Sequence, residues 1–160
     1  GGSWVPHDGP PVAVRALATS QGAPVAIYAG GIALAPGAPQ LFVSPDAATW
    51  SPVATFAGPT DLGNEITAIV VDPVDPRRIW VGFRHPDYVM FSGDRGATWT
   101  RRTSGLGAGS VTSIVRDPAN AAARKFFIGC FLQGAAAPSR AVAFDQPPTI
   151  EGALRGPGPD

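Results

Sequence analysis

The chain has 160 residues, which suits a single domain, and twelve Lys and Arg against twelve Asp and Glu give a formal net charge of zero. This balance, with only 15% charged residues, disfavours a nucleic-acid-binding surface or a polybasic membrane-binding segment. Twenty Gly and 18 Pro predict a turn-dense protein, while the content of Leu, Ile, Val and Phe favours a folded one over a disordered one. No apolar run is long enough to cross a bilayer as a helix.

One unit of sequence recurs along the chain: an apolar strand, a turn rich in Gly, Pro or Asp, and a second strand. Its copies comprise residues 14–19, 20–24 and 25–30; residues 66–71, 72–76 and 78–83; and residues 111–116, 117–120 and 125–131. These runs are short and rich in Val, Ile and aromatic residues, which is typical of strands, and no stretch between them has helical periodicity. We therefore predict an all-β chain.

Two further strands follow in each unit, so that every unit contains four, called a to d. In the middle unit they are residues 66–71, 78–83, 88–92 and 99–103. A four-stranded antiparallel sheet repeated roughly every 40 to 50 residues is typical of the blades of a β-propeller. The nearly continuous apolar character of residues 66–71 fits a sheet that is covered on both faces. About three blades are predicted for this chain.

The turn between strands c and d carries a second repeat. Residues 92–99 read Ser-Gly-Asp-Arg-Gly-Ala-Thr-Trp, and residues 44–50 repeat the pattern with one residue fewer and without its glycine. The longer string resembles the Asp-box of the sialidase-type (BNR) repeat family. The Asp-Pro-Val-Asp-Pro turn at 72–76 is similar to repeats of sortilin-like receptors, photosystem assembly factors and xyloglucan-degrading enzymes. The resemblance covers about residues 12–131; it implies a propeller fold and favours a secreted or periplasmic location.

We expect the residues of the two Asp-box turns to be structural. In a turn, Asp, Ser and Thr side chains form hydrogen bonds with their own backbone, glycine supplies a positive φ, and tryptophan buries its ring. The resemblance also implies that these turns lie away from the substrate-binding mouth. The shorter first turn is expected to be tighter or distorted. The residues concerned are Ser44, Asp46, Trp50, Ser92, Asp94, Gly96, Thr98 and Trp99.

Candidate functional residues lie in the loops at the other end of the blades, here called the mouth end. Antiparallel strands alternate their ends, so the d-to-a and b-to-c loops share this end. Solvated loops are polar by default, but the side chains expected to bind a ligand are His7, Asp8, Asn64, Arg84, His85 and Tyr88. The carboxylates expected to serve as an acid and base pair, if the protein hydrolyses glycosides, are Asp61, Glu65 and Asp87.

No complete catalytic or metal-binding set is recognisable. A sialidase-like enzyme would have an Arg-Ile-Pro start and an arginine triad, but only Arg84 falls in a mouth loop, while Arg15 and Arg116 lie on innermost strands. The pairs His7-Asp8 and His85-Pro86-Asp87 have no fixed metal-ligand spacing, so no metal or cofactor is predicted. Cys130 lies in an apolar run and is predicted to be a buried structural thiol.

Three functions of different classes follow as hypotheses. The favoured one is a non-catalytic binding module that recognises a glycan or a protein through the mouth-end loops. The second is a glycoside hydrolase that uses the mouth-end carboxylates with His85, and the third is a structural or assembly scaffold. Fold alone does not decide among them, because propellers host many functions.

Three blades do not close a ring, since propellers typically have four to eight. We predict blades over residues 12–56, 65–103 and 110–146, a Pro- and Gly-rich tail at 149–160, and an additional d strand near residues 3–6 that contains Trp4. In the favoured account a homodimer completes six blades, each copy lending its Trp4 strand to its partner's third blade. Two alternatives are that another chain supplies the remaining blades and that residues 149–154 complete the third blade.

Overall fold

The computed structural model describes residues 3, 6–21, 24–33, 38–56, 65–84, 89–102, 110–117, 125–131, 140–145 and 149–154. These residues contain twelve strands in three four-stranded sheets, and every pairing within a sheet is antiparallel. The predicted all-β class is confirmed. In this part of the chain no helix is long and apolar enough to span a membrane.

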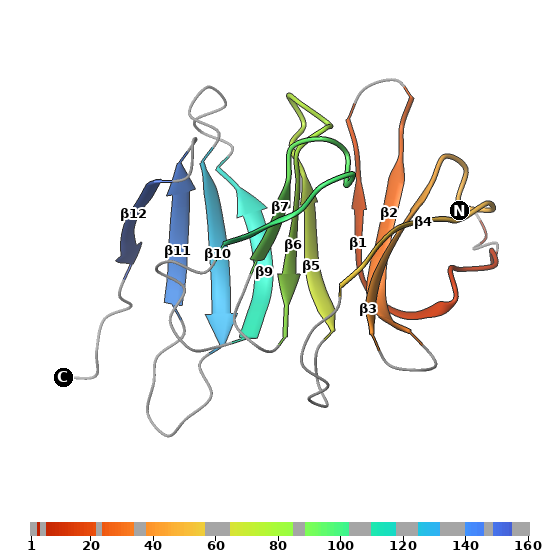
Figure 1. The fold of residues 1–160 in the computed structure, drawn as a ribbon, viewed down its shortest axis with the longest axis horizontal. Helices are drawn as coiled ribbons and strands as arrows, with labels where there is room; N and C mark the ends of the chain where they lie inside the picture. Colours follow the sequence, from red (N-terminus) through yellow and green to blue (C-terminus); the bar gives the residue numbers. More distant parts are fainter. Residues whose placement is uncertain are drawn as a thin grey trace.

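Each sheet is one blade, and its strands are neighbours in the order in which they occur in the chain. Blade 1 consists of β1 (Val12–Thr19), β2 (Ile27–Ala33), β3 (Pro39–Ser44) and β4 (Ser51–Thr55). Blade 2 consists of β5 (Ile66–Val71), β6 (Ile79–Phe83), β7 (Val89–Ser92) and β8 (Thr100–Arg102). Blade 3 consists of β9 (Ser110–Arg116), β10 (Phe126–Phe131), β11 (Arg140–Asp145) and β12 (Thr149–Leu154). Figure 1 shows the three blades following one another along the molecule, with blade 2 in the middle.

The first strand of a blade packs against the blade before it. β5 contacts β1, β2 and β3 of blade 1, and β9 contacts β5 and β6 of blade 2. Blade 2 is thus covered on both faces, and all five residues of β6 are buried. β1 and β9 retain exposed positions, because each belongs to a blade with one described neighbour. This pattern accounts for the apolar character of the middle unit in the sequence.

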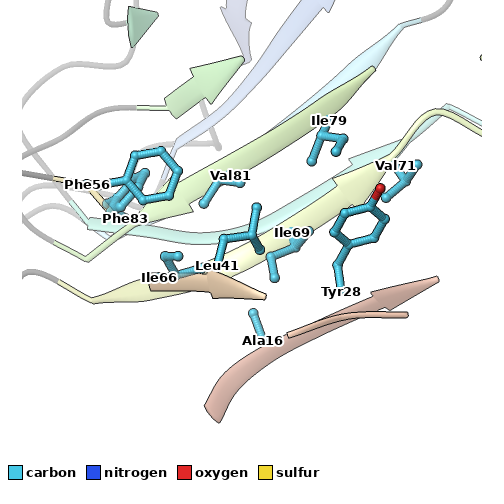
Figure 2. Packing of buried hydrophobic residues seen from close by; sticks show 10 residues of the cluster. All are labelled: Ala16, Tyr28, Leu41, Phe56, Ile66, Ile69, Val71, Ile79, Val81 and Phe83. Carbon is cyan, nitrogen blue, oxygen red and sulfur yellow. The ribbon is translucent and has the colours of Figure 1, made fainter. Parts of the chain in front are cut away.

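Two apolar clusters hold the blades together. The cluster between blades 1 and 2 is drawn in Figure 2 and includes Phe83, whose ring meets that of Phe56 edge-on with centroids 5.0 Å apart. The cluster between blades 2 and 3 centres on Trp80, whose ring lies 4.2 Å from that of Phe126. Burial of this apolar surface between sheets is the main force that stacks one blade on the next.

Glycines on the second strands of blades 1 and 2 let the next blade approach closely. A Cβ atom on Gly30 of β2 would lie 2.7 Å from Cγ2 of Ile66, and one on Gly82 of β6 would collide with the side chain of Val111. Ile66 and Val111 occupy equivalent places on β5 and β9. The same glycine contact is therefore used at both interfaces between blades.

The innermost strands also share a β-bulge. The pairing register shifts between Val14 and Ala16 on β1 and between Ile66 and Ala68 on β5. On β9 the register shift leaves Thr112 unpaired in the same way. A bulge turns the extra residue out of the regular alternation and re-aims its side chain. The bulged residues are Arg15, Thr67 and Thr112.

The third blade differs from the favoured prediction. β12 pairs with β11, with Thr149 opposite Asp145 and Leu154 opposite Ala141, so the chain's own tail supplies the fourth strand. Blade 3 therefore reaches residue 154 instead of ending at 146, and this edge of β11 is not left open for a strand from a partner. A strand adjacent in the chain satisfies that edge locally, without a second molecule. Of the strand predicted near residues 3–6, Trp4 and Val5 lie outside the described residues.

Candidate functional site

Glu65 and Arg84 meet at the mouth end of blade 2. Glu65 directly precedes β5 and Arg84 directly follows β6, and these strands pair with Ile66 opposite Phe83. The backbone N–H of Arg84 donates to the carbonyl of Glu65 at 3.0 Å, and its Nη1 donates to Oε1 of Glu65 at 2.8 Å. The strand pairing thus fixes both residues next to each other.

A third residue, Arg15, reaches this pair from blade 1. It is the bulged residue of β1, and its Nε donates to Oε2 of Glu65 at 3.3 Å. The equivalent residue of blade 2, Thr67, also reaches across to the next blade, where its hydroxyl donates to the carbonyl of Val111 at 2.5 Å. The bulge therefore carries Arg15 across the interface between blades and adds a second guanidinium to the site.

The resulting cluster, formed by Arg15, Glu65 and Arg84, has a buried anion between two exposed cations. The Glu65 side chain is only 11% exposed, whereas those of Arg15 and Arg84 are 58% and 57% exposed. Both carboxylate oxygens accept a hydrogen bond from a guanidinium, so the cluster carries one net positive charge. A guanidinium has five N–H donors, and each arginine uses one of its nitrogens on Glu65. Both arginines therefore keep donors that Glu65 does not occupy.

The remaining predicted residues do not join this cluster in the described part of the chain. The carbonyl of Asp8 accepts a hydrogen bond from Nε1 of Trp50 at 3.1 Å. Trp50 precedes β4 at the end opposite the mouth, so this bond ties the segment with His7 and Asp8 to the Asp-box side of blade 1. The other predicted residues lie outside the described residues: Asp61, Asn64, His85, Asp87 and Tyr88.

Within the described ranges, no three His, Cys, Asp or Glu side chains come together in a group that would hold a metal ion. Cys130 is buried in the cluster between blades 2 and 3. The sequence contains one cysteine, so no disulfide forms within this chain.

The Asp-box turn of blade 2 is a closed network of hydrogen bonds at the end opposite the mouth. Asp94 accepts from the hydroxyl and the backbone N–H of Thr98 and from the hydroxyl of Ser92. These bonds, with that from the Thr98 side chain the most important, lower the pKa of Asp94 to about 2. Gly96 has a φ of 92°, and its carbonyl accepts from Nε1 of Trp99 at 3.0 Å. Each of these polar groups thus has a partner inside the turn.

The shorter Asp-box turn of blade 1 forms a similar hydrogen-bond network with one residue fewer. Asp46 accepts from the backbone N–H groups of Thr49 at 2.8 Å and Ala48 at 2.9 Å, which lowers its pKa. Ala47 takes a positive φ of 61°, where the longer turn places both Arg95 and Gly96 in that region. The indole of Trp50 is then directed to the N-terminal segment instead of to its own turn.

A cavity of about 410 Å³ opens at the Asp-box end, between the a-to-b turns of blades 1 and 2. Burial raises the pKa of Tyr28 in its wall, and the charge of Arg95 partly opposes this. The lining is mostly proline and apolar: Ser20, Gln21, Pro24, Ala26, Tyr28, Pro73, Val74, Pro76 and Arg95. The sequence shows the prolines of these turns but predicts only a structural role for them.

Comparisons with known proteins support the architecture. No family model matches the chain, and no curated protein matches it in sequence. Among solved structures, it is similar to Sqt1 from Chaetomium thermophilum, with 16% identity and a TM-score of 0.53 over 92% of this chain and 36% of that one. It is also similar to the GH74 xyloglucanase from Xanthomonas campestris, with 17% identity and a TM-score of 0.55 over 89% of this chain and 28% of that one.

At such low identity these similarities concern the fold alone, and the chain spans about a third of the length of either protein. Both are propeller proteins. The chain therefore has a β-propeller-like all-β fold, of which these 160 residues form three blades.

Proposed function

We propose that this chain is a non-catalytic binding module that recognises a glycan or protein ligand at the mouth end, through a carboxylate held by Arg15 and Arg84. The supporting observation is that a buried Glu65 fixes both guanidiniums in place while more than half of each arginine side chain is exposed. Fixed guanidiniums bind carboxylates well, because their planar donors match the two oxygens and little side-chain freedom is lost. Asn64, His85 and Tyr88, which the sequence predicts in the mouth-end loops, are expected to bind the same ligand.

The arrangement gives no support to Glu65 as an acid or base in glycoside hydrolysis. A hydrolase requires a second carboxyl about 5 to 10 Å away and an oxygen that faces the substrate. Both oxygens of Glu65 accept hydrogen bonds from arginines. Its role in our proposal is to position Arg15 and Arg84 and to offset part of their charge.

The proposal is tested by calorimetric titration of the chain with three probes: an oligogalacturonate, a neutral oligosaccharide of equal length, and a short polyglutamate peptide. We expect the chain to bind one of the acidic probes and not the neutral one, with an affinity that falls as salt is added. Hydrogen bonds to charged groups contribute about 1.5–3 kcal/mol each, so Arg84→Gln is expected to weaken binding roughly 10- to 100-fold.

Matched variants separate this function from its alternatives. Arg95→Gln removes an exposed arginine at the opposite end of the blades and should leave binding unchanged. Arg84→Lys keeps the charge and should restore only part of the affinity, because lysine lacks the planar fork. Absence of binding to any acidic probe, or equal binding by Arg84→Gln, would refute the proposal. Release of reducing sugar that is lost in Asp61→Asn or Asp87→Asn would favour the hydrolase.

We further propose that the blades belong to the Asp-box repeat family. The support is the pair of turns at 44–50 and 92–99, in which an aspartate gathers N–H and hydroxyl donors at the same place between strands c and d. Kinship of this kind predicts that homologues carry the Ser-x-Asp-x-Gly-x-Thr-Trp string, or its shorter form, between strands c and d of the blades equivalent to blades 1 and 2.

A further inference from the structure

We infer that the open face of blade 3 binds the open face of blade 1 of a second copy of this chain, so that two copies stacked head to tail form one six-bladed ring. This inference concerns whole blade faces and does not rest on the proposed ligand. It also differs from the exchange of a single edge strand, since β12 already occupies the edge of β11.

The first observation is that no described residue of a next blade packs on the glycine of blade 3 that corresponds to Gly30 and Gly82. Gly30 and Gly82 lie under side chains of the next blade, Ile66 and Val111. Gly129 occupies the same position on β10, opposite Ser113 as Gly82 is opposite Ala68. The atoms that a Cβ on Gly129 would meet belong to its own blade. The backbone there is shaped for an inner strand that the described residues do not supply.

The second observation is that blade 1 carries the matching side chains, and that they are exposed. Val14 and Leu17 hold on β1 the positions that Ile66 and Ile69 hold on β5, as their partners on the second strand show. Ile66 is fully buried and Ile69 nearly so, whereas Val14 is 39% and Leu17 66% exposed. Val14 is thus the residue that would lie on Gly129.

The face of blade 3 that points away from blade 2 also has an exposed apolar side chain. Val115 corresponds to Val70 of blade 2, which packs against the apolar cluster shared with blade 3, yet Val115 is 54% exposed. The bulged Thr112 donates to the carbonyl of Gly129 at 3.1 Å, as its equivalent Thr67 does to that of Gly82 at 3.3 Å, but Thr67 also donates to the carbonyl of Val111 on the next blade. In the proposed interface Thr112 would donate to the carbonyl of Val14 of the second copy.

One chain therefore carries both halves of an interface that it uses twice internally. The face of blade 3 repeats, in the same register, the face with which blades 1 and 2 each bind the next blade. Blade 1 of a second copy presents the residues that fit this face. Two copies in this arrangement are related by a twofold axis. Each copy contributes its blade 1 face to one interface and its blade 3 face to the other, so the assembly closes. Leu17 of one copy would lie beside Val115 of the other.

The test measures the mass of the 160-residue chain in solution by sedimentation equilibrium over a range of concentrations. Leu17→Glu and Val115→Lys place a charge in the proposed interface at exposed positions, so neither should affect folding, which circular dichroism and thermal melting will check. Val74→Glu, at a 58% exposed position outside both faces, is the matched control. A mixture of the Leu17→Glu and Val115→Lys chains completes the design.

We expect twice the chain mass for the wild type and the Val74→Glu control, and the mass of a single chain for each interface variant alone. The mixture should return to twice the chain mass, because a mixed pair has one unaltered interface and one in which the introduced carboxylate and ammonium groups face each other across copies. A single-chain mass for the wild type, a higher multiple, variants that still pair, or a mixture that stays apart would each overturn the inference.

Discussion

Replacement of Phe83 by alanine tests how strongly the interface between blades 1 and 2 stabilises the folded chain. Phe83 is fully buried, and its ring meets Phe56 edge-on at 5.0 Å; Phe56 in turn meets Trp99 at 5.1 Å. Truncation of a buried Phe costs about 3–5 kcal/mol, to which an aromatic pair contributes roughly 0.5–1.5 kcal/mol. A domain of this size has about 5–15 kcal/mol of stability, so the variant should remain folded but melt about 10 °C lower.

The assay is urea unfolding of Phe83→Ala, Phe56→Ala and the double variant, followed by tryptophan fluorescence because Trp99 lies in the same aromatic group. The cycle should give a coupling of about 0.5–1.5 kcal/mol between the two rings. Val74→Ala, at an exposed position, should change stability by less than about 0.5 kcal/mol. A loss below about 1 kcal/mol for Phe83→Ala would show that the blades do not pack through this cluster, and the reasoning would fail.

Three further predictions concern the turns and the contacts between blades. Because the pKa of Asp94 is lowered from 3.8 to about 2, its contribution to stability is present above pH 3.8 and is lost as the pH falls toward 2. Asp94→Asn should therefore flatten the decline in unfolding free energy across that range, as measured by urea titrations at each pH, and an unchanged decline would contradict it. Gly82→Ala should cost about 1–3 kcal/mol, since its Cβ collides with Val111, and a neutral effect in thermal melting would refute the glycine contact. Thr67→Val removes the hydrogen bond between blades 2 and 3 and should cost about 1–3 kcal/mol by leaving the carbonyl of Val111 unsatisfied, whereas equal stability in chemical unfolding would argue against that bond.

The strands that are covered on both faces are predictable from sequence. Residues 66–71 are expected as a strand with the bounds that β5 has, because Glu65 and Asp72 delimit an apolar run. β6 begins one residue later than expected, at Ile79. The last strand is harder to predict: β12 contains Glu151 and Gly152 and lacks a clear alternation, so it is one of three alternatives for completing blade 3. Its pairing depends on β11, which the local sequence does not reveal.

The candidate site is only partly predictable. Glu65 and Arg84 are both expected at the mouth end, since the alternation of antiparallel strands fixes which loops share an end. Their contact with Arg15 depends on a bulge in β1, and bulges depend on how neighbouring blades pack. The position of Arg15 on an innermost strand is the available signal. The segment with His7 and Asp8 has no strand to place it, and its contact with Trp50 is set by tertiary packing.

The most direct test of the account is a nuclear Overhauser measurement on chains with labelled Ile and Val methyl groups. Stacking of the blades through their glycines predicts cross-peaks from Ile66 methyls to the Hα protons of Gly30 and from Val111 methyls to those of Gly82. A sample that mixes differently labelled chains should add an intermolecular cross-peak from Val14 to Gly129. Absence of the first two would contradict the three-blade stack itself, and absence of the third alone would contradict its closure by a second copy.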